Sequence, residues 1–309
     1  MNKNIIVSGS LALDRIMDFP GYFSEQILPE KIHVLNVSFQ VNSIKEKFGG
    51  TAGNIAYALS LLGEKPIITA AIGRDYRSYF EWLAKNGIST KHIKVVEDES
   101  TASAYITTDL ADNQITGFYP GAMKYATFFD FDKLNPEETI CIVSPGNITD
   151  MVSYPRLCKA GDVPYIFDPG QALPMLDAGE LVQAIDGCRI LIANDYELDL
   201  ITAKTGRSKK GLLNLAGTII VTRGELGSVV STALEEFEIP AVKPKKVLDP
   251  TGAGDAYRGG LISGLAQGKS IRQCANMGSA CASFCVECYG TQEYRFSPEE
   301  FGDRLGGCG

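Results

Sequence analysis

Apolar runs of strand length alternate with helical patterns along most of this chain. Parallel strands need a crossover between them, and a helix usually supplies it, so this alternation predicts a mostly parallel sheet covered by helices on both faces. Ligands of such sheets collect at the carboxyl ends of the strands. The strand-like runs and the helical patterns that follow them are Ile67–Ile72 before Tyr76–Leu83, Ile140–Ser144 before Met151–Cys158, and Tyr165–Phe167 before Leu181–Ile185, with further runs at Ile190–Ala193 and Ile219–Thr222. Polar residues in or after such runs are Asp14, Asn194, Arg223 and Asp255.

Two segments interrupt the alternation. Lys31–Lys47 has apolar residues at a period close to two, and Thr101–Tyr119 has the pattern of a hairpin with its turn at residues 111–114. Strands inserted between strand–helix units must pair with each other, so we expect a small separate sheet. The chain is then one α/β domain over residues 1–309. The small sheet, from 31–47 and 101–119 with parts of 14–30, is inserted in it discontinuously, either as a lid over a site or as an immobile edge sheet.

Composition excludes several classes of function. The 309 residues carry a net charge of −8 without a cluster of Lys or Arg, which argues against a nucleic-acid surface. The chain starts directly with a strand pattern, and no apolar stretch approaches about 20 residues, so we expect a cytoplasmic protein with no membrane segment. Only two histidines occur, and neither lies in a motif, which disfavours zinc sites rich in histidine.

The eight cysteines permit two interpretations. Cys281, Cys285 and Cys288 have the C-x3-C-x2-C spacing of iron–sulfur radical enzymes. Together with Cys274 they also fall on one stripe of a helix, and cysteine is commonly a small buried apolar residue. No glycine-rich cofactor segment accompanies the triplet, so the sequence favours a core helix. Disulfides are not expected in a cytosolic protein.

The segment Asp249–Asp255 (DPTGAGD) predicts an anion site. Its glycines let backbone N–H groups point together at the start of a helix, where the helix dipole adds partial positive charge. Such a site suits the charge that develops on a phosphoryl group during transfer. Asp255 is placed to accept a proton from an attacking hydroxyl. The alternative is a glycine-rich turn with an N-capping aspartate.

Two further motifs accompany this segment. Phe48–Asn54 (FGGTAGN) puts paired glycines before a helical pattern and offers the donor and acceptor of Asn54 to hydroxyl groups. Ile190–Glu197 (ILIANDYE) is a strand that runs into an N-x-x-E helix start. Glu197 is either an ordinary acid of a first helical turn or a residue that orients a magnesium-bound water near a nucleotide.

The order and positions of these motifs resemble the ribokinase-like (PfkB) family of ATP-dependent kinases over essentially the whole chain. Within that family, four stretches look like adenosine kinases of the mycobacterial type: Phe19–Glu30, Phe118–Met123, Ala193–Glu197 and Gly290–Glu293. The resemblance implies a three-layer α/β/α sandwich with a lid, ATP and Mg²⁺, and a homodimer formed through the lid. It leaves activation by K⁺ open.

The resemblance also implies roles for individual residues. Asp255 would be the general base, Asp249 would brace its loop, and the N–H groups of Gly252, Ala253 and Gly254 would hold the transferring phosphoryl group. Glu197 would reach the metal through water. Acceptor contacts would come from Ser10, Asp14, Ser38, Gly49, Gly50, Asn54 and Phe118. ATP contacts would come from Asn194, Thr222, Arg223, Gly224, Gly227, Asn276 and Ser279.

These roles predict an adenosine kinase that makes AMP from adenosine and ATP. Asp14 would bind the vicinal hydroxyls of a ribose, and Phe118 would stack on the purine. Ala104 departs from the subfamily pattern, which tends to have an aromatic residue there, so stacking on both sides of the base is in doubt. The alternatives are a sugar kinase with the same Asp14, Asn54 and Asp255, and a catalytically silent nucleotide-binding protein. The intact Asp255 and glycine loop argue against the silent protein.

Overall fold

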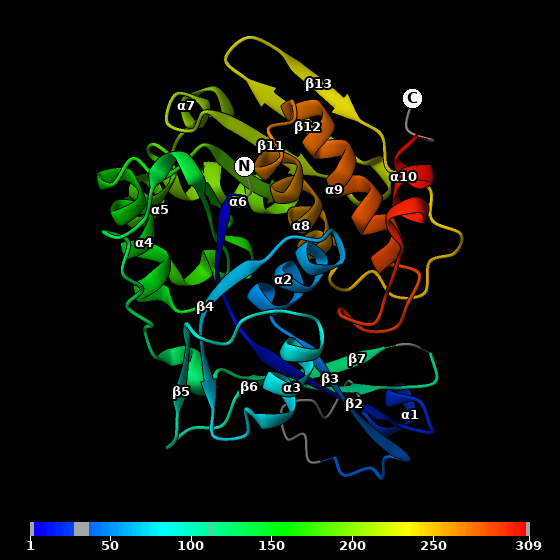
Figure 1. The fold of residues 1–309 in the computed structure, drawn as a ribbon. Coiled ribbons are helices and arrows are strands. Elements are labelled where there is room, and N and C mark those ends of the chain that lie inside the picture. Colours follow the sequence, from blue (N-terminus) through cyan, green and yellow to red (C-terminus); the bar gives the residue numbers. More distant parts are fainter. Residues whose placement is uncertain (1–2, 28–36, 112, 307–309) are drawn as a thin grey trace.

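The computed structural model describes residues 3–27, 37–111 and 113–306 (Figure 1). Nine strands of this described part form a large sheet. All neighbouring strands from β5 to β11 pair in parallel, and β12 and β13 add an antiparallel edge. Across the sheet the strands are β13 (Glu236–Ile239), β12 (Ser228–Thr232), β11 (Thr218–Thr222), β10 (Ile190–Asn194), β9 (Tyr165–Phe167), β8 (Thr139–Val143), β1 (Asn4–Ser8), β4 (Pro66–Gly73) and β5 (Ile93–Val96).

Helices cover both faces of the large sheet, which confirms the predicted three-layer fold (Figure 1). Successive side chains of β1 show the reason: Ile5 and Val7 pack into one core and Ile6 into the other. The first core includes residues of α2 (Thr51–Leu61), α3 (Arg77–Lys85), α8 (Ala253–Ala266) and α9 (Ile271–Cys285). The second includes residues of α4 (Ile148–Ala160), α5 (Ala178–Ile185), α6 (Asp195–Thr205) and α7 (Lys209–Leu213).

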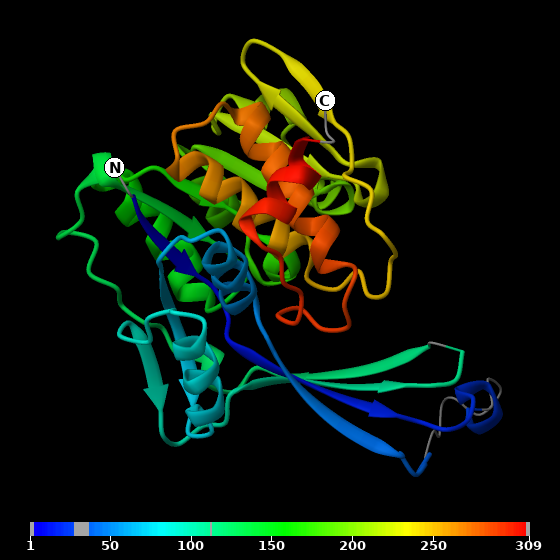
Figure 2. The same cartoon turned by 45° about the vertical axis from the view of Figure 1, so that its right-hand side comes forward.

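A second, four-stranded sheet projects from the large domain as an arm (Figure 2). Its order is β3 (Ser43–Gly49), β2 (Ala12–Asp18), β6 (Ala102–Thr108) and β7 (Gln114–Tyr119). The pair β6–β7 is the predicted hairpin, and β2 joins it in parallel. The expected strand over 31–47 is shorter than predicted, because β3 begins only at Ser43 and residues 37–42 form no strand; Ile32 and Val34 lie outside the described residues.

The remaining helical elements are short, apart from the last one. They are α1 (Phe23–Gln26), η2 (Gly121–Lys124), η3 (Pro136–Glu138), η4 (Gly170–Met175), η5 (Gly224–Leu226) and α10 (Pro298–Gly306). No helix in the described part of the chain combines the length and apolar character needed to cross a membrane. Cys274, Cys281 and Cys285 of α9 are buried in apolar clusters, where they serve as core residues of the helix.

Candidate active site

Three hollows meet at the N-terminus of α8. The lid-side hollow, about 340 Å³, lies between the small sheet and the large domain and includes Asp14, Asn54, Phe118 and Asp255. The central hollow, about 300 Å³, shares Gly252 and Asp255 with it. The outer hollow, about 440 Å³, shares Thr222 and Gly254 with the central one. The segment Gly252–Asp255 therefore connects all three.

The loop before α8, for which the sequence predicts an anion site, contains a glycine in the left-handed region. Gly252 adopts φ +79°, and a Cβ there would lie 2.7 Å from Cγ2 of Thr291, so glycine is required. Asp249 braces the loop: its Oδ1 accepts from the N–H of Thr251 (2.9 Å) and its Oδ2 from the N–H of Gly290 (3.1 Å). The N–H of Ala253 donates to the carbonyl of Pro250 (3.2 Å), whereas Gly252 and Gly254 both line the central hollow.

Asp255 lies on the first turn of α8 and borders both the lid-side and the central hollow. Loss of hydration raises the pKa of its carboxyl to about 6. The charges of Asp168 and Asp14 act in the same direction, while Arg258 and a hydrogen bond from Asn54 lower the pKa. A carboxylate with a pKa near 6 is ionised at neutral pH and still basic enough to accept a proton.

Asn54, on the first turn of α2, contacts Asp255 rather than pointing freely into the hollow. Its Nδ2 donates to Oδ2 of Asp255 (2.8 Å). Its Oδ1 accepts from Oγ1 of Thr291 (2.8 Å) and from Nε2 of Gln292 (2.9 Å). The side chain still lines the lid-side hollow, but its first function in this structure is to hold Asp255.

Asp14 lies on β2, facing the lid-side hollow. A Cβ on Gly49 would lie 2.6 Å from its carboxylate, so that glycine makes room for it. Burial, reinforced by the charge of Asp249, raises the pKa of Asp14 to about 6. Gly50 adopts φ +88° and packs its Cα against the backbone near Ser10. The hydroxyl of Ser10 accepts from the N–H of Thr51 (3.0 Å), so it supports the start of α2 at the rim of the hollow.

The other wall of the lid-side hollow is apolar. Phe118 on β7 pairs in register with Ala104, which pairs with Asp14, so the phenyl ring and the carboxylate share one face of the small sheet. Phe118 is 54% exposed and therefore open to a ligand. Met123, Ala172 and Met175 complete this wall. Ser38 does not line the hollow, because the segment before β3 lies at the far end of the sheet and leaves Ser38 exposed.

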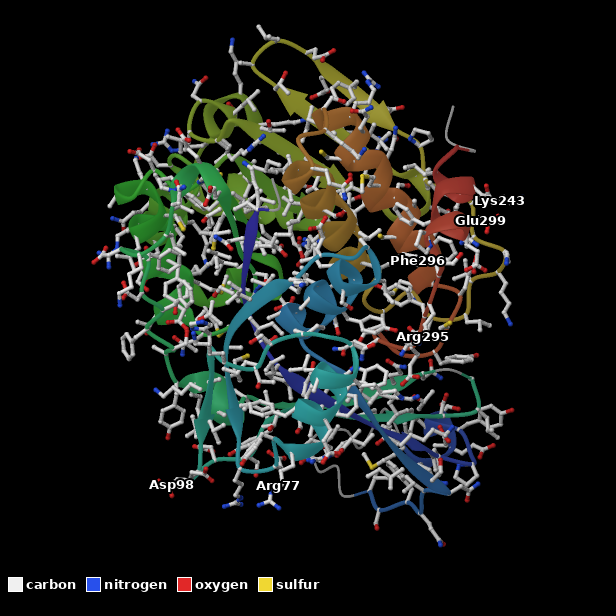
Figure 3. All side chains as sticks on the ribbon, viewed as in Figure 1. Arg77, Asp98, Lys243, Arg295, Phe296 and Glu299 are labelled. Carbon is white, nitrogen blue, oxygen red and sulfur yellow. The ribbon has the colours of Figure 1, made fainter. Side chains whose placement is uncertain are left out.

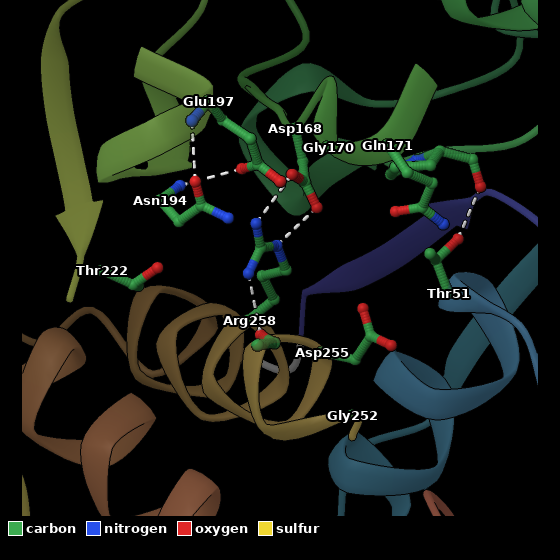
Figure 4. A pocket seen from close by; sticks show the side chains of 12 residues that line it. Thr51, Asp168, Gly170, Gln171, Asn194, Glu197, Thr222, Gly252, Asp255 and Arg258 are labelled. Atoms are coloured by element: carbon green, nitrogen blue, oxygen red, sulfur yellow. Dashed lines mark hydrogen bonds and ion pairs between the residues drawn. The ribbon is translucent and has the colours of Figure 1, made fainter. Parts of the chain in front are cut away.

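A buried ion pair forms the floor of the central hollow (Figure 4). Nη2 of Arg258 donates to Oδ1 of Asp168 (2.7 Å), and Nε of Arg258 donates to Oδ2. Nη1 of Arg258 donates to the carbonyl of Gly254 (3.0 Å), which ties the pair to the first turn of α8. Asn194 and Glu197 form the reciprocal cap of α6 beside it (Figure 4).

Glu197 is the metal candidate of the central hollow. Its carboxylate accepts from the N–H of Asn194 (2.8 Å), and burial raises its pKa. No group of three His, Cys, Asp or Glu side chains in the described part of the chain is arranged to hold a metal ion. Asp168 is paired with Arg258, and Asp255 bonds Asn54, so Glu197 is the carboxylate of this hollow that fits a hydrated Mg²⁺ held through water.

The outer hollow has mostly apolar walls, from Ala241, Val242, Val247, Ala282 and Val286, with Gly224 and Gly227 at its edge. Three of the predicted ATP contacts have other surroundings. Arg223 turns away and pairs with Glu238 of β13 (2.8 Å). Ser279 lines the hollow, but its hydroxyl accepts from Val242 N–H and donates to the carbonyl of Pro240. Asn276 is not among the lining residues, because the hollow covers only the C-terminal half of α9.

Comparison with known proteins identifies the family. The model of the pfkB family of carbohydrate kinases matches residues 19–298. The chain belongs to this family. This PfkB kinase is 32% identical to a nucleoside kinase of Methanocaldococcus jannaschii over 295 residues, which cover 94% of the chain and 92% of the relative. The structure of Burkholderia thailandensis nucleoside kinase in complex with inosine superimposes with a TM-score of 0.87 at 36% identity, covering 97% of this chain and 96% of that one.

The family match confirms the resemblance seen in the sequence, and it makes the protein a kinase that phosphorylates a hydroxyl group. Several residues of this PfkB kinase's site were not found from the sequence. Arg258 follows Asp255 by three residues and shares its helix face, which is a local signal. Asp168 directly follows the strand-like run Tyr165–Phe167, and that place after a strand is a signal in the sequence. Gln171 and Met175 had none, because they reach the site from η4.

Proposed function

We propose that this kinase transfers the γ-phosphoryl group of ATP to the 5′-hydroxyl of a purine nucleoside, with adenosine as its preferred acceptor. The observation that carries the proposal is the composition of the lid-side hollow. One side holds two carboxylates, Asp14 and Asp255, and the other holds an open apolar wall of Phe118, Met123 and Met175. A free sugar has no apolar part for such a wall, whereas a nucleoside has its base.

In this proposal Asp14 binds the acceptor through its sugar. An ionised carboxylate accepts two hydrogen bonds, and the 2′- and 3′-hydroxyls of a ribose present two adjacent donors. The ring of Phe118 lies two strands away on the same sheet face, so the base would stack there. Ala104 between them is small, which leaves this slot aromatic on one side only. The Burkholderia relative is a nucleoside kinase in complex with inosine, a purine nucleoside, which supports an acceptor of this class.

The phosphoryl group would move through the central hollow. Asp255 accepts the proton of the 5′-hydroxyl as that oxygen attacks the γ-phosphorus of ATP, and ADP leaves on the opposite side. The N–H groups at Gly252 and Gly254 and the start of α8 stabilise the charge on the transferred group. Mg²⁺, held through water by Glu197, would neutralise the triphosphate. The apolar outer hollow would take the adenine of ATP.

We also propose that the small sheet forms a homodimer. Met17, Ile44 and Ile115 are in register on the face opposite the site, and Ile44 and Ile115 are 64% and 45% exposed. The edge strand β7 is exposed along its whole length. A second copy of the same sheet would cover both the apolar face and the edge.

An acceptor panel tests the proposed activity. Purified protein is given ATP and Mg²⁺ with adenosine, inosine, guanosine, ribose or fructose, and kcat/KM is measured by ADP release. We expect adenosine to give the highest value, followed by the other purine nucleosides, with both sugars well below. Ribose and the nucleosides would share the contacts to the sugar, so the nucleobase would account for the difference in kcat/KM. A higher kcat/KM for ribose or fructose would favour the sugar-kinase alternative.

A further inference from the structure

A chain of hydrogen bonds runs from Trp82 on α3 to the candidate base on α8. Nε1 of Trp82 donates to Oε1 of Gln292 (2.9 Å). Nε2 of Gln292 donates to Oδ1 of Asn54 (2.9 Å), and Nδ2 of Asn54 donates to Oδ2 of Asp255 (2.8 Å). Gln292 and Asn54 are 2% and 5% exposed, so water does not compete for these groups.

The two ends of this chain fix its direction. An indole N–H can only donate, and an ionised carboxylate can only accept. Between them, the amide of Gln292 must present its oxygen to Trp82 and its nitrogen to Asn54. Tyr79 supports this orientation, because its hydroxyl donates to the carbonyl of Gly49 (2.6 Å) and so accepts from Nε2 of Gln292 (2.9 Å).

Thr291 does not set the direction, although it contacts the same amide. Its hydroxyl lies 2.8 Å from Oδ1 of Asn54 and 3.1 Å from the carbonyl of Phe48. It can donate to Asn54, or donate to Phe48 and accept from a reversed Asn54. Of the two groups that the described residues place on Oδ1 of Asn54, Gln292 opposes the reversal and Thr291 does not, because a reversed Asn54 would bring two N–H donors face to face.

We propose that Trp82 and Gln292 are positioning residues for the catalytic base: they hold Asn54 with its N–H toward Asp255 and so favour the ionised carboxylate. The inference rests on the proposed role of Asp255 in the proposed kinase reaction. A proton on Oδ2 of Asp255 would need an acceptor there, which Asn54 can offer only by reversing against Gln292, and a proton on Oδ1 would leave Oδ2 a weaker, neutral acceptor for the N–H of Asn54. The network therefore favours the ionised carboxylate of Asp255, which is the form that can accept a proton from the acceptor hydroxyl.

The charged groups around Asp255 have to be separated from this effect. They are Arg258 on α8, Asp168 after β9 and Asp14 on β2; the weaker acids nearby are Cys285 on α9, Tyr79 on α3 and Tyr294 before α10. Trp82 and Gln292 carry no charge, so they act on Asp255 only through the direction of Asn54. The guanidinium of Arg295, labelled in Figure 3, lies 5.7 Å from the centre of the Trp82 ring, at the end of the hydrogen-bond series that is remote from Asp255.

The test is the pH dependence of kcat/KM for adenosine at saturating MgATP. Trp82→Phe keeps an aromatic ring where Trp82 stacks on Phe48, and it removes the N–H together with part of the indole ring system. We expect the midpoint of the acidic limb to rise by about one pH unit, a loss near tenfold below the midpoint, with little change on the alkaline plateau. Gln292→Met has a similar length, carries no charge and cannot donate to Asn54 at any pH, so it should move the midpoint further. Tyr57→Phe is the matched control. It removes a hydroxyl in the same aromatic cluster that donates to the carbonyl of Tyr294 and takes no part in the hydrogen bonds from Trp82 to Asp255.

Unchanged midpoints in both variants would overturn the inference, and so would an equal loss of activity at every pH, which indicates a structural role alone. A second readout leaves Trp82 and Gln292 unchanged, so it does not depend on the folding of variants at those two positions. Trp82 is the sole tryptophan, so its indole N–H gives a single NMR resonance, which should titrate in wild type and not in Asp255→Asn. A resonance insensitive to Asp255 would refute the coupling. Failure of the proposed function looks different: wild type would not phosphorylate adenosine, or Asp255→Asn would remain active.

Discussion

Replacing Arg258 with methionine should destabilise the protein strongly, because it removes the only counter-charge that Asp168 contacts among the described residues. The side chains of Arg258 and Asp168 are 8% and 3% exposed, and two N–H groups of the guanidinium bond the carboxylate. Neighbouring carboxylates, Asp168 first among them, raise the pKa of Arg258, so the guanidinium stays charged at any pH at which the protein folds. Methionine fills a similar volume but leaves the Asp168 carboxylate buried and unpaired.

The expected cost is about 3–5 kcal/mol, the range for breaking one side of a buried ion pair. Domains are stable by about 5–15 kcal/mol in total, so this is a large share. An unfolding entropy of about 2.1 cal/mol/K per residue gives about 0.65 kcal/mol/K for 309 residues. The melting temperature should then fall by about 5–8 °C. Asp168→Asn in the same protein should recover part of the loss, because it removes the stranded charge.

Thermal unfolding followed by circular dichroism at pH 7, with urea unfolding alongside, measures both values. Lys133→Met is the control. It breaks the Lys133–Asp130 pair (2.6 Å), whose side chains are 84% and 50% exposed, and should not move the melting temperature measurably. An Arg258→Met protein that melts within 1–2 °C of wild type (about 1 kcal/mol or less) would refute the assignment of this pair as a structural support of the site.

Four further outcomes follow from the site. Asp255→Asn should lower kcat by about 10²–10⁴-fold with ATP binding retained in calorimetry, and near-normal turnover would contradict its role as base. Burial raises the pKa values of Asp14 and Asp255 to about 6, so both carboxylates lose their ionised forms as the pH falls through 6. On the acidic side, a plot of log kcat/KM against pH should therefore approach a slope of two, and Asp14→Asn should reduce that slope to one. Phe118→Ala should raise KM for adenosine and leave KM for ribose unchanged; an equal effect on both would remove the stacking role. Sedimentation at micromolar concentration should show a dimer that Ile44→Lys dissociates, and a 33 kDa wild-type species would exclude it.

Much of the fold could be predicted because its signals are local. Buried parallel strands read as apolar runs, such as Ile190–Ala193, and the helices between them follow from the same pattern. The loop Asp249–Asp255 was found because its glycines have to be glycines: Gly252 occupies a backbone conformation that other residues avoid. The strand before Ser43 was overestimated, since an alternating pattern shows which residues could share a face and not whether a partner strand reaches them.

The sequence by itself determined the layers of the fold, the place of the anion-binding loop and the carboxylates at the strand ends, since backbone conformation and periodicity are properties of neighbouring residues. Only the tertiary structure decided the partners of those groups. Asp168 meets Arg258 across 90 positions, and Asn54 meets Asp255 across 201. Each buried polar atom must find a partner somewhere in the molecule, and which partner it finds depends on how distant elements pack together. For that reason Asn54 bonds Asp255, and a tryptophan on another helix bonds the amide of Gln292 that holds Asn54.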